Sequence, residues 1–290
     1  MDAAEIFKKV RKIEIKTRGL SNQIFSGQYH SNFKGRGMAF SEVREYQFGD
    51  DIRSIDWNVT ARFNHPYVKI FEEERELTVM LLIDVSGSNE FGTRVEMKED
   101  MITEIAAVLA FSAIQNNDKV GVIFFSNTIE KFIPPKKGTS HILRIIRELV
   151  DFKTVNQGTN ISESLRFLTN AIKKRCTTFL LSDFMDKGFE EAMQIANNKH
   201  DVVAIRIYDP RETELPNIGL AKFKDAESGQ STWVDTSSAV TQKTYRDWFM
   251  ETEKYLKRVF LKSGVDVAKI RTDEDYVKPL LSLFKRRGAR

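Results

Sequence analysis

From position 77 to the C-terminus, short apolar runs alternate with longer segments in which apolar residues recur every three or four positions. Short runs rich in Val, Ile and Phe are typical of buried strands, and the longer segments are typical of amphipathic helices. Such alternation predicts an α/β fold with a doubly wound, mostly parallel sheet that helices cover on both faces. The predicted strands are Thr78–Asp84, Lys119–Phe125, Ile129–Ile133, Thr177–Ser182, Asp201–Ile207 and Val265–Arg271.

Helices are predicted between and after these strands. In the first of them, Ile102, Ile105 and Leu109 fall on one face at helical spacing. Thr159 and Asn160 have the side chains that favour the start of a later helix. The predicted helices are Arg94–Asn116, Ser140–Val150, Ile161–Lys174, Phe189–Asn197, Thr241–Lys262 and Asp275–Lys285.

Two segments depart from this pattern and suggest the domain organisation. Residues 1–76 contain glycines and no long periodic segment, so we predict an irregular or small β subdomain that packs on the main domain, 77–290. Around 210–236, Pro and Gly flank two short alternating stretches, Leu220–Lys224 and Ser231–Val234, which predicts a β-hairpin inserted at the edge or rim of the sheet.

The side chains of the N-terminal segment support two expectations. The first is that its aromatic and aliphatic residues need burial. The second is that its charged residues form an ion-pair network that joins the segment to the main domain, or alternatively a surface that faces a partner. The first set is Phe33, Phe40, Tyr46, Phe48, Ile55 and Trp57, and the second is Arg44, Asp50, Asp51, Arg53, Asp56 and Arg62.

Oxygen-bearing side chains follow several of the predicted strands. Asp84, Ser86 and Ser88 come at the end of the first strand, Thr159 lies just before a helix, and Asp183 ends another strand. Carboxyl ends of parallel strands meet at one edge of a sheet, so we expect these side chains to converge. Carboxylates and hydroxyls suit a hard divalent cation, with Mg²⁺ as the first choice and Mn²⁺ or Ca²⁺ as alternatives. Separate capping of helices by Asp84 and Asp183 is the simpler alternative.

These five residues, in this order, resemble the metal-ion-dependent adhesion site of von Willebrand factor A domains, over roughly Leu77 to Arg271. The resemblance implies a von Willebrand A or Rossmann-like fold. In such domains the two serines ligate the ion directly, and the threonine and second aspartate do so directly or through water. The resemblance also implies an open coordination position for an acidic side chain of a partner. We therefore expect a divalent-cation-dependent protein-protein interaction module.

The stretch SNFKGRGMAFSEVREYQFGDDIRSIDWNVTAR, residues 31–62, resembles the signature of the bacterial family called domain of unknown function 58. The resemblance implies work with MoxR-type AAA+ ATPases in the assembly or activation of other proteins. No segment approaches the run of about 20 apolar residues that a transmembrane helix needs. The single cysteine, Cys176, suits a reducing compartment and is interpreted as a core thiol. We expect a cytoplasmic protein, with peripheral contact to the inner membrane as the alternative.

Charge and composition argue against two classes of function, nucleic-acid binding and enzymatic catalysis. Lys and Arg number 45 against 41 Asp and Glu, and the resulting net charge of +4 is too small to demand a polyanionic partner. No nucleic-acid reading motif appears, so no nucleic-acid partner is predicted. The four histidines show no paired spacing and no complete catalytic constellation is found, so an enzyme is not predicted. A metal-dependent phosphoester hydrolase at the same site remains the alternative, although Ser86 stands where an acid-base carboxylate is needed.

Overall fold

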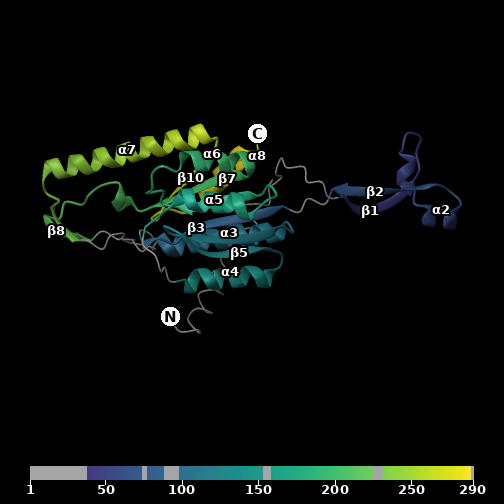
Figure 1. Cartoon of the computed structure of the whole chain (residues 1–290), viewed down its shortest axis with the longest axis horizontal. Helices are drawn as coiled ribbons and strands as arrows, with labels where there is room; N and C mark the ends of the chain where they lie inside the picture. Colours follow the sequence, from purple (N-terminus) through teal and green to yellow (C-terminus); the bar gives the residue numbers. More distant parts are fainter. Residues whose placement is uncertain (1–37, 74–76, 88–97, 153–157, 225–230, 289–290) are drawn as a thin grey trace. The chain divides into compact units, whose positions relative to one another are not determined.

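Figure 1 shows the computed structural model of the chain, which divides into two compact units. The smaller unit is Ser31–Leu77, and the larger contains Thr78–Arg290. The residues that the structure describes are 38–73, 77–87, 98–152, 158–224 and 231–288. Ser88 and Phe33 therefore lie outside the described residues.

A six-stranded sheet forms the centre of the larger unit, with the order β10-β7-β6-β3-β4-β5. Every neighbouring pair in this order is parallel except β4 and β5, which are antiparallel. The predicted mostly parallel α/β fold is thereby confirmed. The strands are β3 (Thr78–Asp84), β4 (Lys119–Phe125), β5 (Ile129–Lys136), β6 (Thr177–Ser182), β7 (Asp201–Tyr208) and β10 (Asp266–Arg271).

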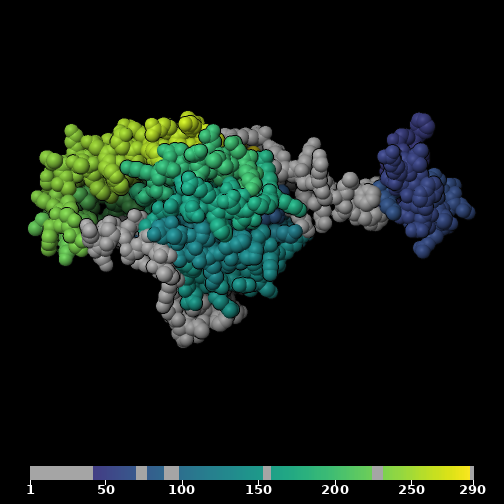
Figure 2. Space-filling view, in the orientation of Figure 1, coloured from purple at the N-terminus to yellow at the C-terminus, as the bar shows by residue number. Residues whose placement is uncertain are grey.

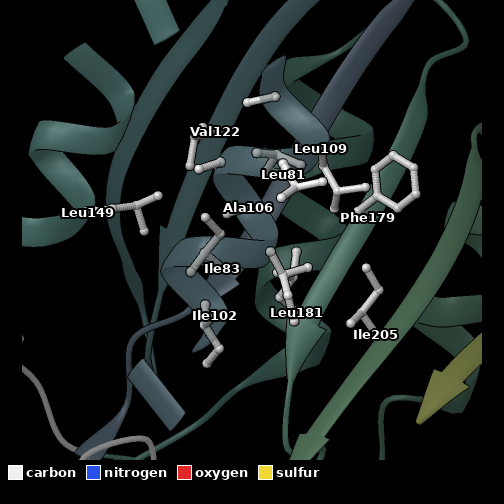
Figure 3. Packing of buried hydrophobic residues seen from close by; sticks show 14 of the residues in the cluster. Leu81, Ile83, Ile102, Ala106, Leu109, Val122, Leu149, Phe179, Leu181 and Ile205 are labelled. Atoms are coloured by element: carbon white, nitrogen blue, oxygen red, sulfur yellow. The ribbon is translucent and has the colours of Figure 1, made fainter. Parts of the chain in front are cut away.

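Helices cover both faces of this sheet because successive side chains of a strand point to opposite faces. Leu81 and Ile83 pack with α3, α4 and α8, whereas Met80 and Leu82 pack with α5, α6 and α7. Figure 3 shows the first of these layers, where Ile102, Ala106 and Leu109 of α3 lie against the strands. The helices are α3 (Lys98–Gln115), α4 (Thr139–Asp151), α5 (Ile161–Ala171), α6 (Glu190–Lys199), α7 (Ala239–Ser263) and α8 (Val277–Gly288).

The predicted element boundaries differ from the observed ones at a few places, each with a local cause. β5 runs past Ile133 through two prolines to Lys136, which an edge strand tolerates because one side of it needs no N–H donor. α5 ends at Ala171, before the predicted Lys174, because Ile172 takes an extended conformation and packs against the core. The predicted first turn of α3, from Arg94, lies outside the described residues before Lys98.

The predicted hairpin is present as a separate two-stranded sheet of β8 (Leu220–Lys224) and β9 (Ser231–Asp235). It follows the short helix η3 (Pro210–Glu212) and leads into α7. The Gln242 side chain in α7 donates to the Thr236 carbonyl at 2.8 Å, which ties the end of the hairpin to the helix. In Figures 1 and 2 the hairpin and the start of α7 lie at one end of the larger unit. The buried residues of α7 all belong to its second half, from Leu256 onward.

The smaller unit is built on an antiparallel pair, β1 (Met38–Glu45) and β2 (Tyr67–Glu73). Between these strands lie η1 (Ile52–Ser54) and α2 (Trp57–Phe63). The side chain of Asp56 caps α2 by accepting from two backbone N–H groups. This is the small β subdomain that the sequence predicts. Its packing on the larger unit stays a prediction.

Two of the residues that were expected to be buried are not covered by this unit itself, and their packing on the larger unit stays a prediction. Phe48 is fully exposed and Trp57 is 67% exposed, whereas Tyr46 and Ile55 are partly buried. Phe48 lies in a turn held by the bidentate ion pair of Arg44 with Asp50, so it belongs to no strand face that the unit covers. This ion pair joins parts of the small unit to each other.

No helix in the described part of the chain is both long enough and apolar enough to cross a membrane.

Candidate functional site

Three loops meet at the carboxyl-terminal edge of the sheet. The Val85 N–H donates to the Phe125 carbonyl at 2.9 Å, which holds the loop after β3 against the end of β4. The Asn160 N–H donates to the Ser126 carbonyl at 2.8 Å, which holds the loop before α5 against the same strand end. Asp183 follows β6, which pairs with β3 on its other side. The structure thus brings Asp84, Thr159 and Asp183 to one edge, as the sequence predicts.

Asp84 is the last residue of β3 and is buried. Its Oδ1 accepts from the Ser86 N–H at 3.0 Å, and its Oδ2 accepts from the Ser182 hydroxyl at 2.6 Å. Burial, together with the like charge of Asp183, raises the pKa of Asp84 to about 7. Two buried carboxylates that disfavour each other's charge in this way are stabilised by a cation.

Asp183 occupies a tight turn at the end of β6. Its Oδ1 accepts from the Met185 N–H at 3.1 Å. The next residue, Phe184, is buried with φ at 60°, a left-handed conformation that is rare for an aromatic residue. The Phe184 N–H donates to the Ser182 hydroxyl at 2.9 Å, and that hydroxyl donates to Asp84. Ser182 therefore links the two carboxylate-bearing loops, a role that the sequence analysis missed.

Thr159 lies just before α5, whose N-cap is Asn160. Its Oγ1 is buried and has no hydrogen-bond partner among the described residues. A buried hydroxyl without a partner costs about 1–3 kcal/mol, so such an atom needs an explanation. The loop itself is well held, because the Asn160 side chain accepts from the Glu163 N–H and the Asp186 carboxylate accepts from the Ile161 N–H.

The described ligand candidates fit a hard divalent cation. Asp84, Ser86 and Asp183 are buried, and each carries an oxygen of the kind that Mg²⁺ or Ca²⁺ takes. Within the described residues, no group of three His, Cys, Asp or Glu side chains could hold a metal ion. An ion at this edge would therefore depend on the hydroxyls of Ser86 and Thr159 as well as on the two carboxylates. Ser88, the fifth predicted ligand, lies outside the described residues.

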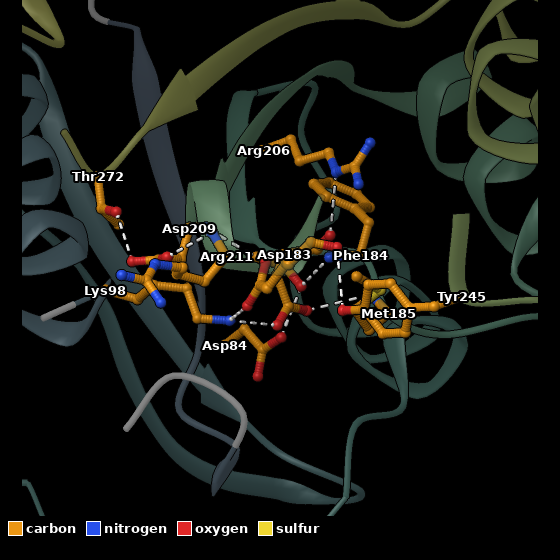
Figure 4. A network of polar contacts seen from close by, with 12 residues as sticks. Asp84, Lys98, Asp183, Phe184, Met185, Arg206, Asp209, Arg211, Tyr245 and Thr272 are labelled. Atoms are coloured by element: carbon orange, nitrogen blue, oxygen red, sulfur yellow. Dashed lines mark hydrogen bonds and ion pairs between the residues drawn. The ribbon is translucent and has the colours of Figure 1, made fainter. Parts of the chain in front are cut away.

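Lys98 is a further member of this cluster that the sequence analysis missed. It is the first residue of α3, and its side chain is 1% exposed. Its Nζ lies 2.9 Å from Asp183 Oδ2 and 2.6 Å from Glu212 Oε1, and Figure 4 shows it pointing toward the same space as Asp84. Burial acts to lower the pKa of Lys98, but the two carboxylates more than offset this and raise it. A lysine within an expected helix gives no signal in the sequence that its side chain turns inward.

Glu212 connects this cluster to the 210–236 segment. It ends η3, where it forms a capping box with Asp209. The hydroxyl of Tyr245 in α7 donates to the Glu212 carbonyl at 3.1 Å. Burial raises the pKa of Glu212, an effect that the charge of Lys98 opposes. The cluster at the sheet edge is thus in contact with η3 and, through it, with α7.

The arrangement gives no new support to phosphoester hydrolysis. Where an acid-base carboxylate would stand, two residues after Asp84, the buried Ser86 donates its N–H to that aspartate. Nucleophilic attack by Asp84 followed by proton transfer has no second carboxylate at this position.

Comparisons with known proteins place the chain in a family. The family model described as "Protein of unknown function DUF58" matches residues 42–255. The chain belongs to the DUF58 family. This confirms the resemblance seen in the N-terminal stretch, and the matched residues run from β1 into α7.

One curated relative matches along the whole of this DUF58 chain, and one solved structure has a similar fold. An uncharacterized protein of Mycobacterium tuberculosis (strain ATCC 25618 / H37Rv) is 26% identical over 298 residues, which cover 100% of this chain and 92% of the relative. The crystal structure of the conserved hypothetical protein BatB from Bacteroides thetaiotaomicron has a TM-score of 0.50 and 17% identity, and covers 74% of this chain and 100% of BatB. The second similarity concerns the fold alone.

Proposed function

We propose that this DUF58 protein is a divalent-cation-dependent protein-binding module. The observation that carries the proposal is the buried Thr159 hydroxyl, which has no hydrogen-bond partner among the described residues and lies at the same sheet edge as two buried carboxylates. The resemblance of these residues to a metal-ion-dependent adhesion site supports it. The proposed ligands of Mg²⁺, or of Mn²⁺ or Ca²⁺, are Asp84, Ser86, Ser88, Thr159 and Asp183.

The site would bind an acidic side chain of a partner through the metal ion. A bound ion would supply an electrophilic open position, since several of its ligands are neutral hydroxyls. Asp84 is oriented by the Ser86 N–H and the Ser182 hydroxyl, and Asp183 is oriented by the Met185 N–H and by Lys98. A carboxylate of the partner would complete the coordination, so capture would need the ion.

The partner that we propose is a MoxR-type AAA+ ATPase, together with the proteins whose assembly or activation it serves. The resemblance to the family signature supports this choice. Leu220 and Trp233 of the hairpin are more than half exposed and would add apolar contacts that metal coordination lacks. Specificity would then come from the 210–236 segment, and the ion would supply the anchor.

The test is retention of the purified MoxR-type ATPase of the same genome on the immobilised chain. Because the ATPase itself uses Mg²⁺, the deciding comparison is made at constant Mg²⁺ between wild type and Asp84→Ala. Asp273→Ala is the matched control, since Asp273 is an exposed aspartate that pairs with Arg271. We expect retention by wild type and Asp273→Ala and loss in Asp84→Ala. Equal retention by all three would refute the role of the metal, and no retention by any would refute the ATPase as partner.

A further inference from the structure

The Lys98 ammonium lies between carboxylates that come from two distant parts of the chain. Asp183 follows β6 and Glu212 ends η3, and both form ion pairs with Lys98. The side chains of Lys98 and Asp183 are each 1% exposed. Lysine is almost never fully buried unless it is paired, because an ammonium without a partner is costly to remove from water. Lys98 is therefore a buried positive charge that the chain itself supplies.

This internal cation uses a carboxylate that the proposed metal site also needs. The Oδ1 atom of Asp183 already accepts from the Met185 N–H, and its Oδ2 atom accepts from Lys98. A divalent cation ligated by Asp183, directly or through water, would share this carboxylate with Lys98 and would lie close to the ammonium. Two cations that share one carboxylate in a low-dielectric interior oppose each other's binding.

Glu212 offers Lys98 a second partner that does not belong to the proposed ligand set. The Lys98 Nζ is 2.6 Å from Glu212 Oε1, and the other carboxylate oxygen accepts from the Asp209 N–H at 3.2 Å. The backbone of Glu212 is held by the Tyr245 hydroxyl of α7. The ammonium can thus leave Asp183 and remain paired, because its other anion is held in place independently.

We propose that Lys98 is a tethered competitor of the divalent cation for Asp183, and that Glu212 weakens this competition by sharing the ammonium. The inference rests on the metal site of the proposed function but not on the identity of any partner. It makes Lys98 a determinant of metal affinity, and it makes η3 a place from which that affinity is adjusted.

The test is direct Mn²⁺ binding to the full chain, measured from the EPR signal of free Mn²⁺ and by calorimetry. Lys98→Met removes the charge and keeps an unbranched side chain. We expect it to bind Mn²⁺ about 5-fold to 150-fold more tightly than wild type, the range of ordinary coupling between two ligands. Lys131→Met is the matched control, because Lys131 pairs with Glu148 at the surface and should leave the affinity unchanged.

Glu212→Gln should change the Mn²⁺ affinity in the opposite direction, and together with Lys98→Met it forms a double-mutant cycle. When Glu212 is replaced by a neutral glutamine, the Lys98 ammonium has only Asp183 as an anionic partner. Lys98 then competes more strongly with Mn²⁺ for Asp183, so Mn²⁺ binding should weaken. In the Lys98→Met background the same change should have little effect, because Glu212 acts through Lys98. An equal effect of Glu212→Gln in both backgrounds would mean that Glu212 acts directly on the ion, and would overturn the sharing role.

The remaining outcomes are separable. Equal Mn²⁺ affinity in wild type and Lys98→Met overturns the competition and leaves the proposed metal site standing. Mn²⁺ binding by neither chain overturns both. If Lys98→Met folds only with Mn²⁺, the ion replaces the ammonium and the competition is supported. If it folds under no condition, Glu212→Gln alone decides, and an affinity equal to or tighter than that of wild type contradicts the competition.

Discussion

Asp84→Asn should stabilise the metal-free protein at alkaline pH. Burial and the neighbouring charge of Asp183 raise the pKa of Asp84 to about 7, whereas the ordinary value is 3.8. Between pH 4 and pH 7 the unfolded chain loses this proton and the folded chain keeps it. Wild-type stability therefore falls as pH rises through this window, and the loss is complete above it. Asparagine does not ionise, so the stability of Asp84→Asn does not fall in this way as pH rises.

The magnitude follows from the shift and from one hydrogen bond. A shift of about three pKa units corresponds to roughly 4 kcal/mol at about 1.4 kcal/mol per unit. The substitution also disturbs the bond from the Ser182 hydroxyl to Asp84 Oδ2, at a cost of about 1 kcal/mol. Asp84→Asn should thus be more stable than wild type by about 3 kcal/mol near pH 8, and less stable by about 1 kcal/mol near pH 4.

The assay is urea unfolding in EDTA at a series of pH values, with the difference in free energy of unfolding between variant and wild type as the readout. Asp273→Asn, an exposed aspartate in an ion pair with Arg271, serves as the control and should show no such crossing. Added Mg²⁺ should stabilise wild type and leave Asp84→Asn unchanged, because binding to the folded state alone raises stability. A difference that stays constant from pH 4 to pH 8 would refute the electrostatic reasoning.

Two further predictions concern the body of the sheet. Gly121→Ala should destabilise the fold by about 1–3 kcal/mol in urea unfolding, because a Cβ there would lie 2.7 Å from Met80 Sδ and 2.9 Å from the Pro135 nitrogen; an unchanged midpoint would contradict this packing. Cys176 should resist iodoacetamide at pH 8 until the chain is unfolded, because burial raises the pKa of its thiol to about 11. Its neighbour His200 does not help to ionise the thiol, since burial lowers the pKa of His200 to about 4 and leaves the ring neutral. Stoichiometric labelling of the folded chain would count against it.

The sheet and its helices could be predicted from sequence because burial imposes a period. Strands such as Thr78–Asp84 are buried at nearly every position and appear as continuous apolar runs. The metal-ligand candidates could be predicted because small oxygen-bearing residues follow these runs. Phe48 and Trp57 were expected to be buried, but the small unit alone has too little chain to cover them, and their burial against the larger unit stays a prediction.

The rest of the site could not be predicted because its members are brought together by tertiary structure alone. Lys98 begins a helix, Ser182 is the last residue of a strand, and Glu212 lies in a short turn after another strand. Each has an ordinary local explanation, as a first-turn residue, a strand residue and a cap. Only the packing of α3 and η3 around the Asp183 turn gives Lys98 and Glu212 a shared role.

The topology explains why positive charge is needed at this edge at all. β3 and β6 are parallel neighbours in which Ile83 pairs with Leu181, so Asp84 lies opposite Ser182 and next to Asp183. The register sets Asp84 beside Ser182, and the turn that follows β6 leaves Asp183 near enough for its charge to raise the pKa of Asp84. Lys98 supplies one positive charge from within the chain, but it is shared with Glu212, so the acidic charges outnumber it. A divalent cation would neutralise the remaining negative charge of the carboxylates. We therefore expect metal binding and the ion pairs of Lys98 to offset the same electrostatic repulsion.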